Sequence, residues 1–326
     1  MASIDAIDAT RRPFTGRRVR LGDLILQGVA GAAALGAMVL ILLIAYKVVD
    51  GARPSIEQFG LRFLVHIDWD PVKGVFGAGS FLFGTAVTSL VALVLAAPLA
   101  LGIALFLTEL APSGLRAPVT ALVETLAAIP SVVIGLWGIL VLGPVLRDHV
   151  EPFLHDVLGF IPLFGPASLV GSSVFTAIVV LTIMILPIVS SISRELFLGV
   201  PSELKEAALA LGTTRWEMVR GVMFPYARGG IAAALILGLG RAVGEAIAVT
   251  QVIGSFTGIQ WNLFKPGDTL ASKIAEEYQG AATNLQIASL IYLALILLVF
   301  SLIVNLIAQW IVRSVARRQG LTGARA

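Results

Sequence analysis

Long apolar stretches dominate the sequence, and most of the charged residues fall in the short segments between them. A helix of about 20 apolar residues crosses the hydrocarbon core of a membrane, which is roughly 30 Å thick. Six stretches reach that length and predict membrane spans at residues 24–49, 76–108, 117–146, 167–193, 226–253 and 284–312. Several of them exceed one membrane thickness, which predicts tilted helices or short interfacial turns at their ends.

The composition supports the same fold class. Of the 326 residues, 57% are hydrophobic and 13% are charged, and the mean hydropathy is +0.94. Soluble domains carry about 25% charged residues, so these values exclude a soluble domain. We therefore predict an all-α integral membrane protein, in which residues 23–313 form a single transmembrane domain between tails at residues 1–22 and 314–326.

Basic residues are distributed unequally between the two sides of the predicted spans. Fifteen fall on the side of the two termini: Arg11, Arg12, Arg17, Arg18, Arg20, Arg116, Arg194, Lys205, Arg215, Arg220, Arg228, Arg313, Arg317, Arg318 and Arg325. Six fall on the opposite side: Arg53, Arg62, Lys73, Arg147, Lys265 and Lys273. The side richer in Lys and Arg faces the cytoplasm, so we predict that both termini and the connection between spans four and five are cytoplasmic. The first span is too long for the apolar part of a cleaved signal peptide, which favours a retained anchor.

Several kinds of chemistry have no basis in the sequence. The chain has no cysteine, and therefore no disulfide, thiol nucleophile or cysteine metal site. It has no GxxxxGK[ST] phosphate-binding loop, so we predict that it does not hydrolyse ATP and is not itself an enzyme. Gly238, Gly240 and Gly244 of the fifth span are expected instead to let a neighbouring helix approach closely, since Gly240 and Gly244 are one turn apart.

A group of acidic residues and histidines precedes the fourth span. Its members are Asp148, His149, Glu151, His155 and Asp156. Pro152 interrupts any single helix face between the two histidines, which disfavours a metal site. We favour a solvated extracytoplasmic loop that meets a soluble protein, and we predict no metal and no other cofactor.

Two ionisable residues, Arg241 and Glu245, lie deep in the fifth span. They are four residues apart, so a continuous helix would bring them to one face. An arginine near the centre of a membrane costs about 2.5 to 3.5 kcal/mol on insertion scales and therefore needs a partner or a water-filled path. A guanidinium attracts oxyanions and binds two of their oxygens at once. We predict that Arg241 lines a substrate pathway with Glu245 as its counter-charge; the alternative is a structural ion pair to another subunit.

Other unusual residues in the spans are expected to be structural. Glu124 follows Pro118 by six residues, near the cytoplasmic interface, where an interhelical hydrogen bond or snorkelling satisfies a carboxylate. Pro98, Pro130 and Pro187 each remove a helix hydrogen bond and predict bends in spans two, three and four.

The connection between spans four and five contains an amphipathic segment, ELKEAALALGTTRWEMVRGVMFP, at residues 203–225. Two short helices are predicted to meet at Gly212, because glycine readily adopts the left-handed conformation that ends a helix. Ala207, Ala208 and Leu211 are expected to form a narrow face on which the groove of a partner can close.

This segment resembles the EAA loop of ABC importer permeases. Glu206, Ala207 and Ala208 match the three residues that name the loop, and Gly212 and Pro225 follow at the family's spacing. Phe224 stands where the family has leucine. The resemblance implies that residues 203–225, which we call the EAA-like segment, dock on a separate ATP-hydrolysing subunit. The alternative is an interfacial helix without a partner.

Most of the chain also resembles the PstC-type permeases of phosphate-specific ABC importers. The resemblance is carried by WDPVKGVFGAGSFLFGTAVTSL from Trp69, ETLAAIPSVVIGLWG from Glu124, GRAVGEAIAV from Gly240 and TLASKIAEEY from Thr269. It implies a type I ABC importer permease fold in a bacterial plasma membrane, with Arg241 and Glu245 on the family's charged pair. The implied partners are a PstA-type second permease, two ATP-binding subunits, an extracytoplasmic phosphate-binding protein and membrane lipid, and not nucleic acid. The chain departs from the family at Ala246, where threonine is frequent.

The resemblance implies a mechanism as well. Closure of the ATP-bound partners would move the EAA-like segment and, through Pro225, the fifth span. A loaded binding protein would dock on the loops around residues 69–83 and 261–278.

Three other functions fit the sequence less well. A permease for sulfate or molybdate would keep the EAA-like segment but lack the stretches that begin at Trp69 and Thr269. A secondary transporter or channel needs no such segment and usually shows an internal repeat of its spans. An intramembrane enzyme needs a nucleophile or a metal set in the spans, and all three histidines fall in the predicted loops.

Overall fold

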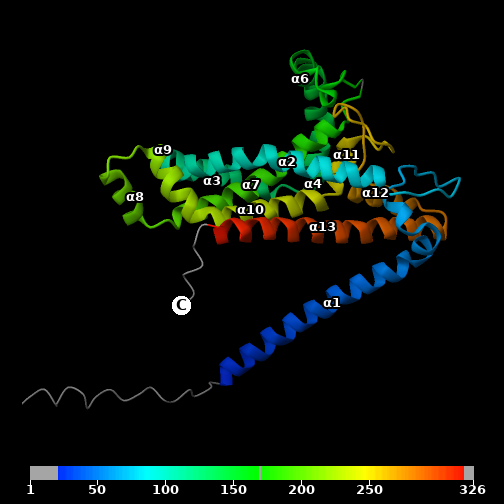
Figure 1. The fold of residues 1–326 in the computed structure, drawn as a ribbon, viewed down its shortest axis with the longest axis horizontal. Coiled ribbons are helices and arrows are strands. Elements are labelled where there is room, and N and C mark those ends of the chain that lie inside the picture. Colours follow the sequence, from blue (N-terminus) through cyan, green and yellow to red (C-terminus); the bar gives the residue numbers. More distant parts are fainter. Residues whose placement is uncertain (1–20, 169, 319–326) are drawn as a thin grey trace, which may run out of the picture. The chain divides into compact units, whose positions relative to one another are not determined.

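The computed structural model describes residues 21–168 and 170–318, which are mostly helical (Figure 1). The described residues contain one isolated β-bridge, between Asp70 and Val75, and no longer strand. Six of the described helical stretches are long and apolar enough to cross a membrane: Leu24–Leu64, Gly79–Leu110, Ser131–Leu158, Val174–Leu198, Arg215–Gly244 and Asn284–Val312. The prediction of an all-α protein with six spans is confirmed, but two of the spans are interrupted where we expected continuous helices.

The chain divides into two compact units, residues 1–48 and 49–326. Residues 21–48, the described part of the first unit, belong to helix α1 (Leu21–Phe59). Its apolar side chains are exposed on every face from Leu24 to Ile44. A helix that is apolar all round suits a membrane span. The predicted tails at residues 1–22 and 314–326 lie largely outside the described residues.

Helix α7 (Val174–Leu198) is the centre of the second unit and packs against α2 (Gly79–Leu105) and α10 (Phe224–Gly244). The alanines of α2 that face it are fully buried: Ala92, Ala96 and Ala100. Small side chains let membrane helices approach closely. The resulting van der Waals packing stabilises their association in lipid, where the hydrophobic effect does not drive helices together. Pro98 and Pro187 lie inside α2 and α7, which remain single helices.

Of the three glycines at which we expected a close helix approach, only Gly238 makes one to a described helix of this chain. A methyl group added to Gly238 would lie 2.6 Å from the Ile185 side chain, whereas one added to Gly240 or Gly244 would meet no described atom within 4 Å. Gly238 therefore forms the contact with α7, and the other two glycines face away from the chain's own core.

The third span differs most from the prediction. Instead of one helix over residues 117–146, α3 (Ser113–Ala128) ends before Pro130, where Ile129 takes the extended conformation favoured before proline. The helical path then continues to Leu158 through the elements α4 (Ser131–Trp137), η4 (Gly138–Leu142), α5 (Gly143–Val145), η5 (Leu146–Val150) and α6 (Glu151–Leu158). The residues that we assigned to a solvated loop are therefore helical, and Glu151 is buried and accepts a hydrogen bond from the Ser173 hydroxyl.

The fifth span is also divided. Helix α10 ends at Gly244, Glu245 is extended with φ −73° and ψ 117°, and α11 (Ile247–Ile253) follows. The expectation of one helix over residues 226–253 is therefore wrong. The polar contacts that form at this break are part of the candidate functional site.

The remaining helices lie at the two ends of the second unit or complete it. They are η2 (Gly60–Leu64), η3 (Phe106–Leu110), η6 (Pro162–Phe164), α8 (Ser202–Ala210), α9 (Arg215–Met218), η7 (Val219–Met223), α12 (Leu270–Glu277), η8 (Tyr278–Gly280) and α13 (Asn284–Arg318). Helices α8 and α9 lie at one end of the bundle and α12 lies toward the other (Figure 1). The EAA-like segment is thus separated from the loops around Trp69 and Thr269 by the length of the spans.

Candidate functional site

The EAA-like segment folds as two short helices joined by a left-handed glycine. Helix α8 ends at Ala210 and α9 begins at Arg215. Between them Gly212 has φ +84°, a conformation that other residues rarely adopt. The Thr213 hydroxyl donates to the carbonyl of Ala208 at 2.8 Å, and the same carbonyl accepts from the N–H of Leu211 at 3.2 Å at the end of α8. The expected meeting of two helices at Gly212 is confirmed.

Helix α9 and the start of α10 are fixed by local signals. The Thr214 hydroxyl accepts a hydrogen bond from the N–H of Glu217, and the Glu217 carboxylate accepts one from the N–H of Thr214, which is a capping box. Pro225 lies at the start of α10, directly after the π-helical turn η7, and has no N–H to donate to that preceding turn. The path from the segment into the fifth span is therefore helical throughout, with one π-helical turn at η7.

One face of the EAA-like segment is exposed and the other is packed. Glu206 and Ala207 are exposed, and the side chains of Leu211 and Trp216 are 85% and 64% exposed. Ala208 packs on a buried cluster at the end of the bundle, which contains Ala104, Phe197, Val200, Met218, Val219, Met223, Ala227 and Ile231. Ala207 and Ala208 therefore do not form one outward face. The exposed surface is made by Glu206 and Ala207 with the two large apolar side chains.

Arg241 and Glu245 meet even though they do not share a helix. The Arg241 Nη2 lies 3.3 Å from the Glu245 Oε2, and Glu245 Oε1 accepts a hydrogen bond from the N–H of Ala248 at 3.2 Å. The Glu245 side chain is 5% exposed and that of Arg241 is 47% exposed. The expected ion pair is present, and the guanidinium also faces outward from the chain.

The break at Glu245 explains why both contacts form. The first turn of a helix leaves N–H groups without intrahelical partners, and a carboxylate there is favoured by the helix dipole. Glu245 supplies such a carboxylate to α11 while it pairs with the last turn of α10. Membrane transporters use discontinuous helices of this kind to bring backbone dipoles and polar groups into the bilayer. The sequence signal for the break was Gly244, a residue typical of helix ends.

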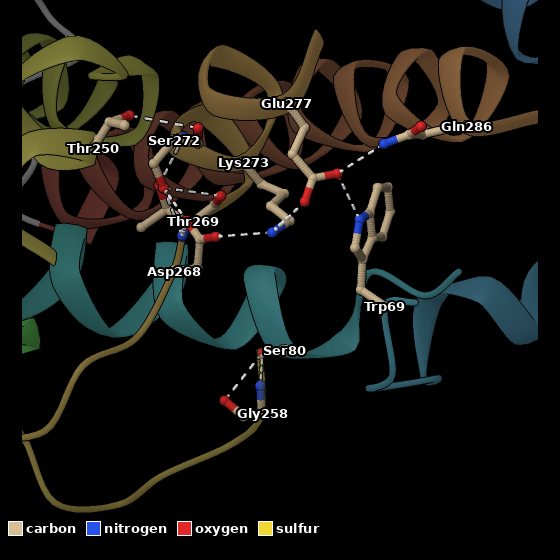
Figure 2. A network of polar contacts seen from close by, with 10 residues as sticks. All are labelled: Trp69, Ser80, Thr250, Gly258, Asp268, Thr269, Ser272, Lys273, Glu277 and Gln286. Atoms are coloured by element: carbon tan, nitrogen blue, oxygen red, sulfur yellow. Dashed lines mark hydrogen bonds and ion pairs between the residues drawn. The ribbon is translucent and has the colours of Figure 1, made fainter. Parts of the chain in front are cut away.

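A polar network at the opposite end of the bundle was not foreseen. Lys273 lies between two carboxylates, with its Nζ 2.7 Å from Glu277 Oε1 and 3.7 Å from Asp268 Oδ2, as Figure 2 shows. Its side chain is only 8% exposed and lies over the rings of Trp69 and Phe81. The sequence indicated Lys273 only as one of the six basic residues on the side opposite the termini. The contacts that bury it come from the distant Trp69 loop.

Glu277 and Asp268 connect this network to other elements. Glu277 Oε2 accepts hydrogen bonds from the indole of Trp69 at 2.8 Å and from the amide of Gln286 at 3.3 Å. Asp268 Oδ1 accepts from the Ser272 hydroxyl and from the N–H of Thr269, whereas Asp268 Oδ2 has no hydrogen-bond partner among the described residues. Burial raises the pKa of Asp268 to about 6, against the opposing effect of the Ser272 hydrogen bond.

The two loops that were expected to form one docking region do lie side by side. Ser80 Oγ donates to the carbonyl of Gly258 at 3.0 Å and accepts from its N–H at 2.8 Å (Figure 2). Phe83 and Trp261 form an edge-to-face ring contact at 5.4 Å. The Thr85 hydroxyl accepts from the N–H of Leu270 at 2.9 Å and joins α2 to α12. Residues from both loops thus pack into one structured region.

The remaining candidates form no site of their own. Glu124 is exposed and lines a small pocket with the side chains Leu107, Thr120, Val123, Ser190, Ser191 and Arg194. Within residues 21–168 and 170–318, no group of three or more His, Cys, Asp or Glu side chains is placed to hold a metal ion.

The arrangement of the spans is that of the membrane permeases of ABC importers. A chain of the bacterial alginate ABC transporter, solved in complex with an alginate pentasaccharide-bound periplasmic protein, matches 93% of this chain and 99% of its own length, with a TM-score of 0.58 and 19% identity. A chain of the MetNI methionine ABC transporter in an inward facing conformation matches 72% of this chain and 93% of its own length, with a TM-score of 0.52 and 21% identity.

Sequence relatives define the family more closely. The model of the binding-protein-dependent transport system inner membrane component matches residues 99–317. The phosphate transport system permease protein PstC of Mesorhizobium japonicum is 41% identical over 323 residues, 97% of this chain and 98% of its own. PstC 2 of Mycobacterium tuberculosis is 43% identical over 300 residues, 90% of this chain and 92% of its own. The chain belongs to the binding-protein-dependent transport family and, within it, to the PstC permeases, which confirms the resemblance.

Proposed function

We propose that this chain is the PstC-type permease subunit of an ATP-driven importer of inorganic phosphate in a bacterial plasma membrane. The observation that carries the proposal is the 41% identity to a phosphate transport permease over 97% of the chain. Because the sequence holds no phosphate-binding loop for ATP, the hydrolysis belongs to two partner subunits. A PstA-type permease completes the membrane part of the complex.

The EAA-like segment is the surface that binds an ATP-hydrolysing subunit. Its support is the exposed face formed by Glu206, Ala207, Leu211 and Trp216, because large apolar side chains on a short exposed helix suit a partner's groove. The distribution of basic residues assigns this segment, with both termini, to the cytoplasm, where ATP is available. Gly212 and Pro225 fix the geometry of the surface and its connection to the fifth span.

Arg241 lines the pathway and attracts the phosphate oxyanion. Its guanidinium is nearly half exposed within a span, although a charged group there requires water, an anion or a partner subunit. Glu245 holds the guanidinium when no anion is bound. Arriving phosphate competes with this carboxylate for the same donors, since both are oxyanions.

The polar network at the other end of the bundle supports a docking surface for the loaded phosphate-binding protein. The contacts of Trp69 and Lys273 give this region a defined shape, and rigid surfaces bind partners without an ordering cost. The surface faces the extracytoplasmic side if the EAA-like segment faces the cytoplasm.

The test is uptake of radiolabelled phosphate into proteoliposomes that contain this chain, its companion permease and the ATP-binding subunits, with loaded binding protein outside. We expect uptake that requires ATP inside and is not diminished by excess sulfate or molybdate. Uptake of sulfate or molybdate in place of phosphate would assign another oxyanion. Uptake without ATP would point to a secondary transporter.

A further inference from the structure

The EAA-like segment is attached to the second span, which ends almost a hundred residues before it. The Lys205 Nζ of α8 lies 2.7 Å from the Glu109 Oε1 in the π-helical turn η3. The side chains of Lys205 and Glu109 are only 19% and 18% exposed. An ion pair so shielded from solvent is far less weakened by salt than an exposed pair.

Glu109 also receives a contact from the second helix of the segment. The Arg215 Nη1 of α9 donates to the backbone carbonyl of Glu109 at 3.2 Å. Carbonyls in the last turn of a helix lack intrahelical partners, so this one is free to accept. The same residue therefore binds α8 through its side chain and α9 through its backbone. The Lys205 Nζ also donates a hydrogen bond, at 3.5 Å, to the carbonyl of Phe197 at the end of the fourth span.

Apolar packing beneath these contacts joins the same elements. Ala104, near the end of α2, is fully buried in one cluster with Met218 and Met223 of the EAA-like segment and with Phe197 of α7. Phe197 and Phe224 form an edge-to-face ring contact at 5.5 Å. Close-packed interiors transmit displacement because they have little free volume in which to absorb it.

We propose that Glu109 is a positioning residue that makes the inner end of the second span move with the EAA-like segment as one body. The movement of the ATP-binding subunits is then transmitted to span two as directly as to span five. The inference rests on the proposed function in that it requires an ATP-driven partner on the segment. Separating the two parts would leave a shielded charge without its partner, which is strongly unfavourable, so the pair keeps them together.

The first test measures phosphate uptake per ATP hydrolysed in the reconstituted complex. We expect Glu109→Gln and Lys205→Met each to lower this ratio about fivefold, the effect of a coupling free energy near 1 kcal/mol, with the subunits still assembled. The exchanged pair Glu109→Lys with Lys205→Glu should recover most of the ratio. The matched control is Glu195→Gln, which removes the exposed Arg194–Glu195 pair of α7 and should leave the ratio unchanged. Unchanged coupling in the assembled Glu109 and Lys205 variants would overturn the proposal.

The second test measures distance and does not depend on the substrate. Because the chain has no cysteine, Leu110→Cys and Leu204→Cys introduce single spin-label sites on its second span and on α8, at exposed positions. We expect the distance between these labels to stay the same with and without an ATP analogue in the full complex. The distance from Leu204→Cys to Tyr278→Cys, at the other end, serves as the reference for movement. A nucleotide-dependent change between positions 110 and 204 would refute rigid coupling, whereas a wild-type complex that takes up no phosphate would refute only the proposed function.

Discussion

Arg241 and Glu245 are paired at 3.3 Å across the point at which the fifth span changes from α10 to α11. The carboxylate is buried and also holds the N–H of Ala248, so it joins the end of one helix to the start of the next. The guanidinium is the more exposed partner. This asymmetry supports the proposal that Arg241 binds a second anion while Glu245 keeps its position.

Replacing Arg241 should therefore slow transport strongly without disrupting assembly. We expect Arg241→Gln to reduce ATP-driven phosphate uptake about ten- to hundredfold, because hydrogen bonds to charged groups contribute about 1.5 to 3 kcal/mol. Arg241→Lys keeps the charge but loses the paired donors and should have an intermediate effect. Co-purification of the ATP-binding subunits checks assembly. Normal uptake in the glutamine variant would leave the ion pair with a structural role only.

The two contacts of Glu245 can be separated by substitution. Glu245→Gln removes the negative charge but retains an oxygen that can accept from the N–H of Ala248, whereas Glu245→Ala removes both contacts. We expect the alanine variant to be less stable than the glutamine variant by about 1 kcal/mol, the usual contribution of a helix-capping side chain. Thermal unfolding in detergent measures the difference. Equal midpoints for the two variants would show that the hydrogen bond to Ala248 adds nothing.

Gly212 allows a test of the left-handed turn without steric interference. A methyl group there meets no described atom within 4 Å, so the cost of Gly212→Ala comes from the backbone alone, about 1 to 2 kcal/mol. We expect weaker binding of the ATP-binding subunit, and Gly212→Asn should partly restore it because asparagine tolerates this conformation. Gly221→Ala is the matched control, since Gly221 is equally open and has no positive φ. Equal affinities for the variants at positions 212 and 221 would contradict this role of the turn.

Asp268 should make the stability of the chain depend on pH. Its pKa is raised by burial from 3.8 to about 6, so the folded chain keeps a proton that the unfolded chain releases. This contribution is complete below pH 4 and is lost as the pH rises through 6, which lowers the free energy of unfolding by up to about 3 kcal/mol. The Asp268→Asn side chain cannot titrate. Its free energy of unfolding should therefore rise relative to that of the wild type across this pH window.

Unfolding midpoints in detergent at pH 4, 5, 6 and 7 measure that difference. Asp70→Asn is the control with the opposite sign, because the Lys73 hydrogen bond lowers the pKa of the exposed Asp70. Parallel midpoint curves for the wild type and Asp268→Asn would rule out titration of this carboxyl group between pH 4 and 6.

The apolar pattern predicted the number of spans, and it predicted the sixth span, Asn284–Val312, at both ends. It missed the break at Glu245 because hydropathy averages over a window and does not register a change of backbone conformation within it. At Pro130 the proline predicted a bend, and the structure has a complete break there. The left-handed turn at Gly212 was predictable because glycine adopts this conformation more readily than other residues. The burial of Lys273 was not predictable, because its position depends on Trp69. The indole of Trp69 is hydrogen-bonded to Glu277, 208 positions away in the sequence.

The interruption of the fifth span also determines where that span can bend. A continuous helix resists a change of direction because bending it breaks backbone hydrogen bonds. At Glu245 the backbone is already extended and the helical ladder is already open. A few dihedral angles there can change with little loss, as in the hinges of domain movements. The residue that holds Arg241 in place thus also marks the point where α10 and α11 can swing relative to one another.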